Sequence, residues 1–215
     1  MQRLALPLAD KTDWVKVFDP RGGGLFVASP DPPAVGTEVR VDLTIGGRGP
    51  RVILKGSVVL RRTEAEGRGP SGCSVGLAID EREKVNFLNG YVRGGLINRR
   101  ERRRLPLRLP VSYAAEGGQR STFSRDINEE GIFILSDSPL PEESIISFTL
   151  TVPGRPAPIA LRGVVSHTVI VEDEDTPGMG VRYVAAETDL GEMVKLVDEL
   201  EAKFLTGTLP EEVIT

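Results

Sequence analysis

The sequence predicts a mainly β protein made of two small antiparallel β-barrels, each followed by a C-terminal α-helix. Three observations carry this prediction. The first half of the chain repeats in the second half, apolar residues alternate with polar ones in both halves, and each half ends in apolar residues spaced three and four apart. Alternation is typical of a half-buried strand, and the longer spacing is typical of an amphipathic helix. At 215 residues the chain is long enough for two domains of about 100 residues each.

The repeat appears at an offset of 107 residues. Residues 19–27 then align with residues 126–134, and the alternating apolar residues of 39–45 align with those of 146–152. We therefore expect each copy to contain a short first strand, a turn, several antiparallel strands and a closing helix. This is the layout of a small barrel with a helix packed on it.

The last strand and the helix of each copy follow the same pattern. After a loop of different length, residues 75–79 align with residues 179–183 at an offset of 104. A helical pattern then follows in both copies. The apolar residues at helical spacing are Val85, Leu88, Tyr91 and Val92 in the first copy, and Leu190, Met193, Val194, Val197, Leu200 and Phe204 in the second.

Domain boundaries follow from this repeat. Two glycines at 94–95 are expected to end the first helix. We predict a first domain at 1–93, an arginine-rich linker and ligand arm at 94–104, a second domain at 105–207, and a C-terminal tail at 208–215.

Three residue types occur only once in the chain. Trp14 lies in an alternating segment that predicts a strand, and its side chain belongs either to the core or to an interface. Cys73 and His167 are the only cysteine and the only histidine, so an internal disulfide has no second cysteine and the sequence offers no convincing zinc cluster or Ser-His-Asp triad. Because no carboxylate is paired with a recognisable base, nucleophile or metal set, we expect a non-catalytic protein without a cofactor.

Charge is distributed unevenly. The formal net charge is −4, but residues 99–104 hold five arginines and one glutamate, so the remainder of the chain sums to −8. A cationic segment on an acidic body predicts an anionic partner for that segment. No apolar run approaches the roughly 18 residues of a membrane span, and the N-terminus does not read as a secretory signal, so we expect a cytoplasmic protein.

The arginine segment and a turn at 126–131 together suit a nucleotide. Arginine offers five donors in a planar fork that can grip phosphate and stack on a base. Asp126 offers an acceptor pair for the edge of guanine, Asn128 adds a donor and an acceptor, and Gly131 lets the backbone bend or approach a ligand closely.

These two segments resemble the signatures of PilZ domains. Residues 100–104, Arg-Glu-Arg-Arg-Arg, resemble the RxxxR signature, and residues 126–131, Asp-Ile-Asn-Glu-Glu-Gly, resemble the [D/N]xSxxG signature. The resemblance covers residues 99–205 and implies a six-stranded barrel with a C-terminal helix. Many such domains bind cyclic di-GMP, so it also implies that ligand. Asn128 stands where the family usually has serine, so we expect an altered affinity.

The resemblance implies a role for each matched residue. Arg100 and Arg104 would hold phosphates and stack on a guanine, Asp126 would read a guanine edge, Asn128 would contact base or phosphate, and Gly131 would admit the ligand. Arg103 takes the last position if the signature begins at Arg99 instead. A paired first arginine, here Arg99 with Arg100, often accompanies an intercalated ligand dimer in the family.

The first repeat departs from both signatures. It has Arg21 in the serine position and only Arg3 upstream. We therefore expect it to bind no nucleotide and to serve instead as a partner-binding or dimerising unit, which keeps a homodimer among the assemblies the sequence allows.

The resulting hypothesis is a cyclic di-GMP receptor. Ligand would order the arginine arm, which is also the interdomain tether, reorient the two domains and alter binding to an unidentified protein partner, in motility or surface behaviour as the resemblance implies. One alternative is a ligand-independent scaffold that acts through protein contacts. Another is a nucleic-acid-binding arm, against which the scarcity of aromatic residues argues.

Overall fold

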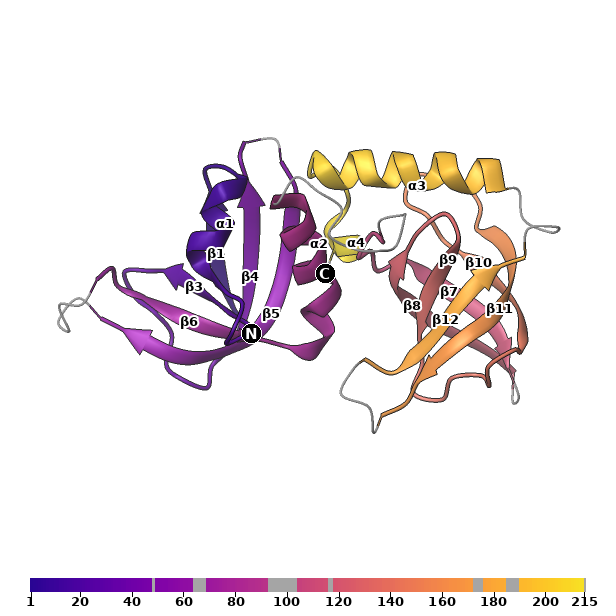
Figure 1. The fold of residues 1–215 in the computed structure, drawn as a ribbon, viewed down its shortest axis with the longest axis horizontal. Coiled ribbons are helices and arrows are strands. Elements are labelled where there is room, and N and C mark those ends of the chain that lie inside the picture. The colour runs from indigo at the N-terminus through magenta and orange to yellow at the C-terminus, as the bar shows by residue number, and fades with distance from the viewer. Residues whose placement is uncertain are drawn as a thin grey trace. The chain divides into compact units, whose positions relative to one another are not determined.

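The computed structural model describes residues 1–47, 49–63, 69–92, 104–115, 118–171, 176–184 and 190–214. The chain divides into two compact units (Figure 1). The first comprises residues 1–97 with the short segment 205–207, and the second comprises residues 98–204 and 208–214. Both units are built mainly from strands.

The first unit is a six-stranded sheet followed by a helix. Its elements are β1 (Gln2–Leu8), η1 (Lys11–Asp13), α1 (Trp14–Val17), β2 (Phe18–Asp19), β3 (Gly24–Ala28), β4 (Glu38–Ile45), β5 (Arg51–Arg62), β6 (Gly72–Leu77), η3 (Ile79–Glu81) and α2 (Arg82–Val92). The strand order is β1-β4-β5-β6-β3-β2. Strand β1 runs parallel to β4, which differs from the antiparallel barrel expected for this half. A parallel pair needs a long crossover, and the chain from η1 to β3 supplies it.

Trp14 lies in this crossover and not in the strand that alternation predicted. It begins the short helix α1, is 1 % exposed, and stacks on Phe18 with ring centroids 4.7 Å apart. Its indole Nε1 donates a hydrogen bond of 2.9 Å to Asn89 Oδ1 on α2. Of the two expectations for this side chain, the core is therefore the correct one.

The second unit is a closed barrel followed by helices. Its elements are β7 (Pro110–Ala115), β8 (Gly118–Ile127), β9 (Gly131–Leu135), β10 (Ile145–Leu150), β11 (Ile159–Val169), β12 (Gly178–Tyr183), α3 (Leu190–Leu205) and α4 (Glu211–Ile214). The strands follow the order β10-β11-β12-β9-β8-β7, and β10 also pairs with β7 to close the barrel. All of its strand pairs are antiparallel. The mainly β fold, and the barrel followed by a helix in this half, are confirmed.

Strand registers confirm the internal repeat and correct one part of it. Gly24 on β3 lies opposite Gly76 on β6, and Gly131 on β9 lies opposite Arg182 on β12. The first strands are thus related by the predicted 107 residues, but the last strands are related by 106 and not by 104. A slip of two residues preserves the alternation of faces, so the period-two pattern could not detect it.

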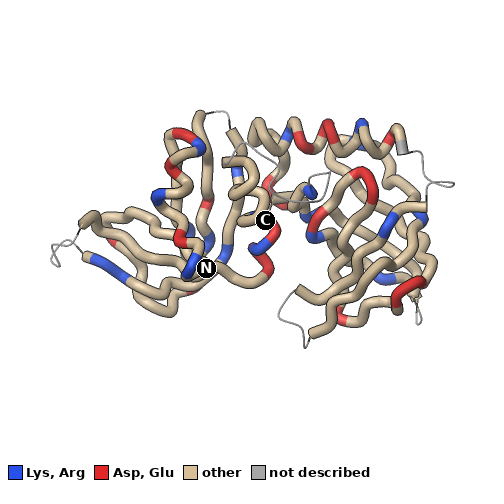
Figure 2. Tube along the Cα trace, in the orientation of Figure 1, with Lys and Arg blue, Asp and Glu red and all other residues tan. Residues whose placement is uncertain are grey.

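Helix α3 lies across one end of the barrel (Figure 1). Its buried residues are Met193, Leu196, Val197, Leu200 and Phe204. Val194, expected on that face, is 39 % exposed, and Leu196 takes its place. Acidic and basic residues recur along the length of the helix (Figure 2), and most of them are exposed.

The end of the chain, expected to be a tail, is folded onto the second unit. Val213 and Ile214 of α4 are buried, and the Val213 carbonyl accepts a 2.8 Å hydrogen bond from the backbone N–H of Arg108. None of the helices in the described ranges is both long and apolar enough to cross a membrane.

Candidate functional site

Arg104 ends the arginine segment and leads into the second unit. Arg99, Arg100 and Arg103 lie outside the described residues. From Arg104 onward the chain pairs with the end of β8, because Leu105 and Ile127 exchange two backbone hydrogen bonds of 2.8 and 3.0 Å. Every second residue of this stretch is a fully buried leucine. These leucines are Leu105, Leu107 and Leu109. A 2.9 Å hydrogen bond from the Leu107 N–H to the Leu105 carbonyl makes a tight turn between the first two. Burial of the leucines anchors this stretch and places Arg104 beside β8.

Asp126 on β8 holds Arg104 in position. The Asp126 carboxylate is 0 % exposed, and its Oδ1 accepts a 2.7 Å hydrogen bond from Arg104 Nη1. Its Oδ2 accepts a 2.9 Å hydrogen bond from Arg125 Nε. A buried carboxylate is stable only when it is paired and hydrogen-bonded. With two guanidinium groups on one carboxylate, this cluster carries one excess positive charge.

Arg125 was not among the residues expected at the site. The register of β8 against β9 shifts between Ser124 and Asp126, so Arg125 is the extra residue of a β-bulge. Its guanidinium lies 3.6 Å from the centroid of the Phe133 ring. The bulge thus leaves Arg125 and Asp126 side by side opposite Phe133. Alternation of apolar residues gives no signal for a bulge, but the adjacent Arg-Asp pair in the sequence could have suggested this interaction.

Asn128 closes the turn between β8 and β9. Its Oδ1 accepts hydrogen bonds from the backbone N–H groups of Glu130 at 3.1 Å and of Gly131 at 2.9 Å. Its own backbone N–H donates to the Gly131 carbonyl at 2.9 Å. An oxygen-bearing side chain that holds the backbone two or three residues ahead is the usual device of such a turn. The side-chain oxygen therefore has a structural role, and the amide nitrogen is the group that a ligand could use.

Close packing of strands requires a glycine at position 131. A Cβ at this position would collide with the backbone carbonyl oxygen of Val181 on β12. Gly24, its counterpart in the first unit, would collide in the same way with the Val75 carbonyl oxygen on β6. Since both units need the glycine and only one carries the signature residues, strand approach accounts for Gly131 without a ligand.

Tyr183 on β12 is a second residue that the sequence did not suggest. Its side chain is buried, and within the described part of the chain its hydroxyl has no hydrogen-bond partner. Burial raises the pKa of Tyr183, the nearby Arg104 lowers it, and Asp126 raises it further. The buried Nε of Arg104 likewise has no hydrogen-bond partner among the described residues. Within the described ranges, the Arg104–Asp126 pair and its neighbour Tyr183 thus contain two polar groups without partners.

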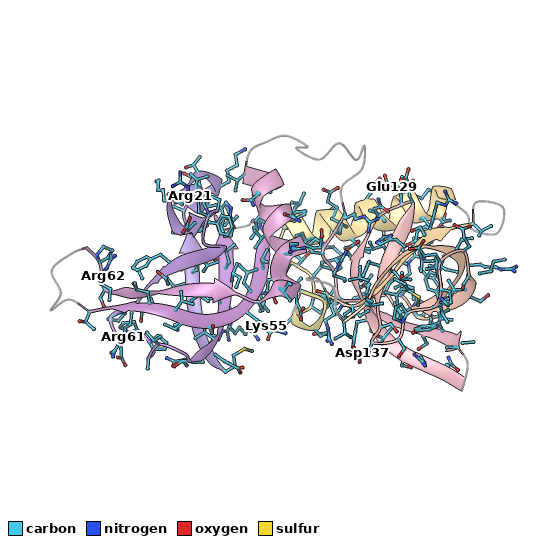
Figure 3. All side chains as sticks on the ribbon, turned by 60° about the horizontal axis from the view of Figure 1, so that its bottom comes forward. Arg21, Lys55, Arg61, Arg62, Glu129 and Asp137 are labelled. Atoms are coloured by element: carbon cyan, nitrogen blue, oxygen red, sulfur yellow. The ribbon has the colours of Figure 1, made fainter. Side chains whose placement is uncertain are left out.

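The corresponding turn of the first unit lacks this cluster. Asp19, the counterpart of Asp126, is exposed, and its Oδ1 accepts a 2.9 Å hydrogen bond from the backbone N–H of Arg21. Arg3, the only upstream arginine, lies in β1 and forms an ion pair with Asp42 instead. Figure 3 shows Arg21 at the turn before β3 and Glu129 at the corresponding turn before β9.

Residues 98–199 match the family model of the PilZ domain. No curated protein matches the sequence. Similar solved structures include the Bacillus subtilis inhibitor of motility MotI/DgrA, at 13% identity over 87% of this chain and 88% of that one, with a TM-score of 0.39.

Two further similar structures are complexes with c-di-GMP. The PilZ domain of YcgR from Escherichia coli with c-di-GMP is 14% identical over 49% of this chain and 94% of that one, with a TM-score of 0.37. The K. pneumonia MrkH–c-di-GMP complex is 10% identical over 84% of this chain and 76% of that one, with a TM-score of 0.40. On the match of the family model to residues 98–199, this chain contains a PilZ domain.

Proposed function

We propose that this chain is a non-catalytic receptor for cyclic di-GMP. The observation that supports the proposal best is the placement of Arg104, which the buried Asp126 holds at 2.7 Å on the PilZ domain. A guanidinium fixed in advance loses little conformational entropy when it binds phosphate, and pre-organisation of this kind strengthens binding.

The proposed ligand contacts come from the arm and from the turn. Arg104 and the preceding Arg99, Arg100 and Arg103 supply the cations for two phosphates and a planar surface for a guanine. Asn128 contributes its amide group beside Gly131. Asp126 acts first as a positioning residue because both of its oxygens already accept hydrogen bonds. Each carboxylate oxygen has a further lone pair, which could accept a hydrogen bond from a guanine edge.

The proposed output is a rearrangement of the two units. The arm that binds the ligand is also the segment that joins the first unit to the second in the sequence. Ordering this segment on the barrel would restrict the orientations open to the first unit and change the surface offered to a protein partner. The family resemblance implies that the process controlled by this receptor is motility or surface behaviour.

The test is titration calorimetry with cyclic di-GMP on the native chain and two variants. Arg104→Ala and Arg100→Ala each remove a charge-assisted contact of about 1.5–3 kcal/mol, so the dissociation constant should rise by about tenfold to a hundredfold. Arg100→Ala matters because it leaves the buried Arg104–Asp126 pair intact. Arg120→Ala is the matched control, since Arg120 lies on β8 of the same barrel but is exposed.

Native protein that gives no saturable binding would overturn the proposal. So would affinities that are the same in the native chain and in both arm variants.

A ligand-independent scaffold is the second candidate, and one observation favours it. The Asp126 oxygens and the Asn128 oxygen already accept hydrogen bonds from the protein itself. A site satisfied in this way does not need a nucleotide for its stability. This candidate expects partner binding to be unaffected by cyclic di-GMP and by Arg100→Ala.

A further inference from the structure

A row of side chains crosses four strands on the outer face of the barrel. Asp126 on β8 lies opposite Phe133 on β9, Phe133 lies opposite Gly180 on β12, and Gly180 lies opposite His167 on β11. Directly opposed residues share one face of a sheet. The alternate residues of β9, Ile132 and Ile134, point into the core and are buried. With neighbouring strands about 4.8 Å apart, three steps span about 14 Å.

Two glycines allow aromatic rings to lie flat on this face. A Cβ on Gly178 would collide with the Phe133 ring, and a Cβ on Gly180 would collide with the His167 ring. The centroids of the two rings are 5.8 Å apart. Phe133 is fully buried, with Arg125 on one side and His167 on the other, so these two outer groups are what the row presents to a ligand.

Both outer groups are held in place. Arg125 is fixed by Phe133 and by its hydrogen bond to Asp126, and 12% of its side-chain surface remains exposed. The half-buried His167 follows Ser166, the extra residue of a second bulge. The Ser166 hydroxyl donates a 3.0 Å hydrogen bond to the Gly180 carbonyl and lies 3.2 Å from His167 Nδ1. The imidazole is thereby fixed beside the glycine.

The first unit serves as an internal comparison. It keeps the ring on a glycine, because a Cβ on Gly72 would collide with the Phe26 ring. At the other positions of the row it differs, and the substitutions are Phe18 for Arg125, Leu60 for His167 and Ser74 for Gly180. What both units share belongs to the framework. Both units also place a guanidinium over this ring, but Arg125 lies 3.6 Å from the Phe133 centroid whereas Arg62 lies 5.6 Å from the Phe26 centroid. The unit with the signature residues is therefore the one that has the closer guanidinium and the imidazole.

We propose that Arg125 and His167 form a second base subsite, on which one purine of the dinucleotide packs while the arm holds the other. This inference rests on the proposed function. A guanidinium and an imidazole both offer flat faces for stacking with a purine. The row extends from the Arg104–Asp126 pair to β11, and that length suits a dinucleotide better than a mononucleotide.

The most direct test follows one resonance. His167 is the only histidine, so its imidazole protons give a single set of signals in an NMR spectrum of the full chain. A purine stacked on the ring should shift these signals upfield as cyclic di-GMP is added, with the same saturation as the calorimetric titration. Signals that stay in place while calorimetry shows binding would overturn the subsite and leave the receptor proposal standing.

Variants provide the second test. His167→Ala should weaken cyclic di-GMP binding about tenfold, the size of one base stack, whereas His167→Phe keeps a flat ring and should restore most of the affinity. Arg125→Lys keeps the charge beside Asp126 but loses the planar group, and should also weaken binding. Leu60→Ala, at the matching position of the first unit, should have no effect. Native affinity in both His167→Ala and Arg125→Lys would overturn the subsite, whereas a native chain that binds no cyclic di-GMP would overturn the receptor proposal together with it.

Discussion

At the scale of single residues, the site depends on the balance of charge around Asp126. One buried carboxylate is shared by Arg104 and Arg125. Replacing one member of a buried ion pair leaves its partner without a counterion in a poorly solvated place, which costs more than the pair itself contributes. Asp126 therefore matters for stability as well as for the position of the arginines.

The first prediction tests this role. Asp126→Asn keeps the size of the side chain and removes its charge, so we expect the free energy of unfolding to fall by about 3 kcal/mol. Urea unfolding of the full chain provides the measurement. Asp137→Asn is the control, because Asp137 is exposed on the same barrel (Figure 3) and should change stability by less than about 0.5 kcal/mol. Equal effects of the two substitutions would contradict the role given to Asp126.

The second prediction concerns Tyr183 and pH. Because its pKa is raised in the folded protein, the unfolded chain loses this proton first as the pH rises through about 10. The folded state then holds more protons than the unfolded state, so stability falls with increasing pH. Tyr183→Phe should remove this part of the pH dependence and be at least as stable as the native chain at neutral pH, since the lost hydroxyl has no partner among the described residues. If the native chain and Tyr183→Phe show the same dependence of unfolding free energy on pH from pH 8 to 11, this prediction is contradicted.

The sequence identified part of this residue-level arrangement. Arg104, Asp126, Asn128 and Gly131 were expected at one place. Arg104 pairs with Asp126 at the end of β8, and Asn128 holds the turn that leads to Gly131 at the start of β9. Their role as a ligand site stays a prediction. Arg125 was missed because a bulge adds one residue to a strand without disturbing the apolar pattern on either side. Tyr183 was missed because contacts between distant strands depend on register.

At the scale of elements, closely approaching strands set the register in both units. The repeat predicted from the sequence is present in the structure. The predicted alignment of its last strand was wrong by two residues, and the parallel direction of β1 was not predicted. Neither feature alters an alternating pattern. The matched glycines Gly24 and Gly131 do report register, because each allows the neighbouring strand to approach where a Cβ would collide with its backbone.

The third prediction uses this match. Gly131→Ala and Gly24→Ala should each lower the free energy of unfolding by about 1–3 kcal/mol, as overpacking against a backbone usually does. The strand pairs on which the two residues lie belong to different units, so the two effects should add. Gly47→Ala is the control, because a Cβ there meets nothing within 4 Å. Loss of ligand binding in Gly131→Ala without loss of stability would instead favour the ligand-admitting role that the family resemblance implies.

At the scale of the whole molecule, the proposal makes one segment both sensor and connector. The fourth prediction is that saturating cyclic di-GMP changes the small-angle X-ray scattering profile of the native chain, because the ordered arm limits the arrangements of the two units. The profile of Arg100→Ala at the same ligand concentration should remain closer to that of the free protein. A native profile that does not change at saturation would contradict the coupling while leaving ligand binding intact.

The central claim is that the PilZ domain binds cyclic di-GMP through the arginine arm, and the fifth prediction addresses it directly. In titration calorimetry, the native chain and Arg120→Ala should bind the ligand with the same affinity, and Arg100→Ala and Arg104→Ala should bind it at least tenfold more weakly. Absence of saturable heat with the native chain, or one affinity shared by all four proteins, would contradict the claim.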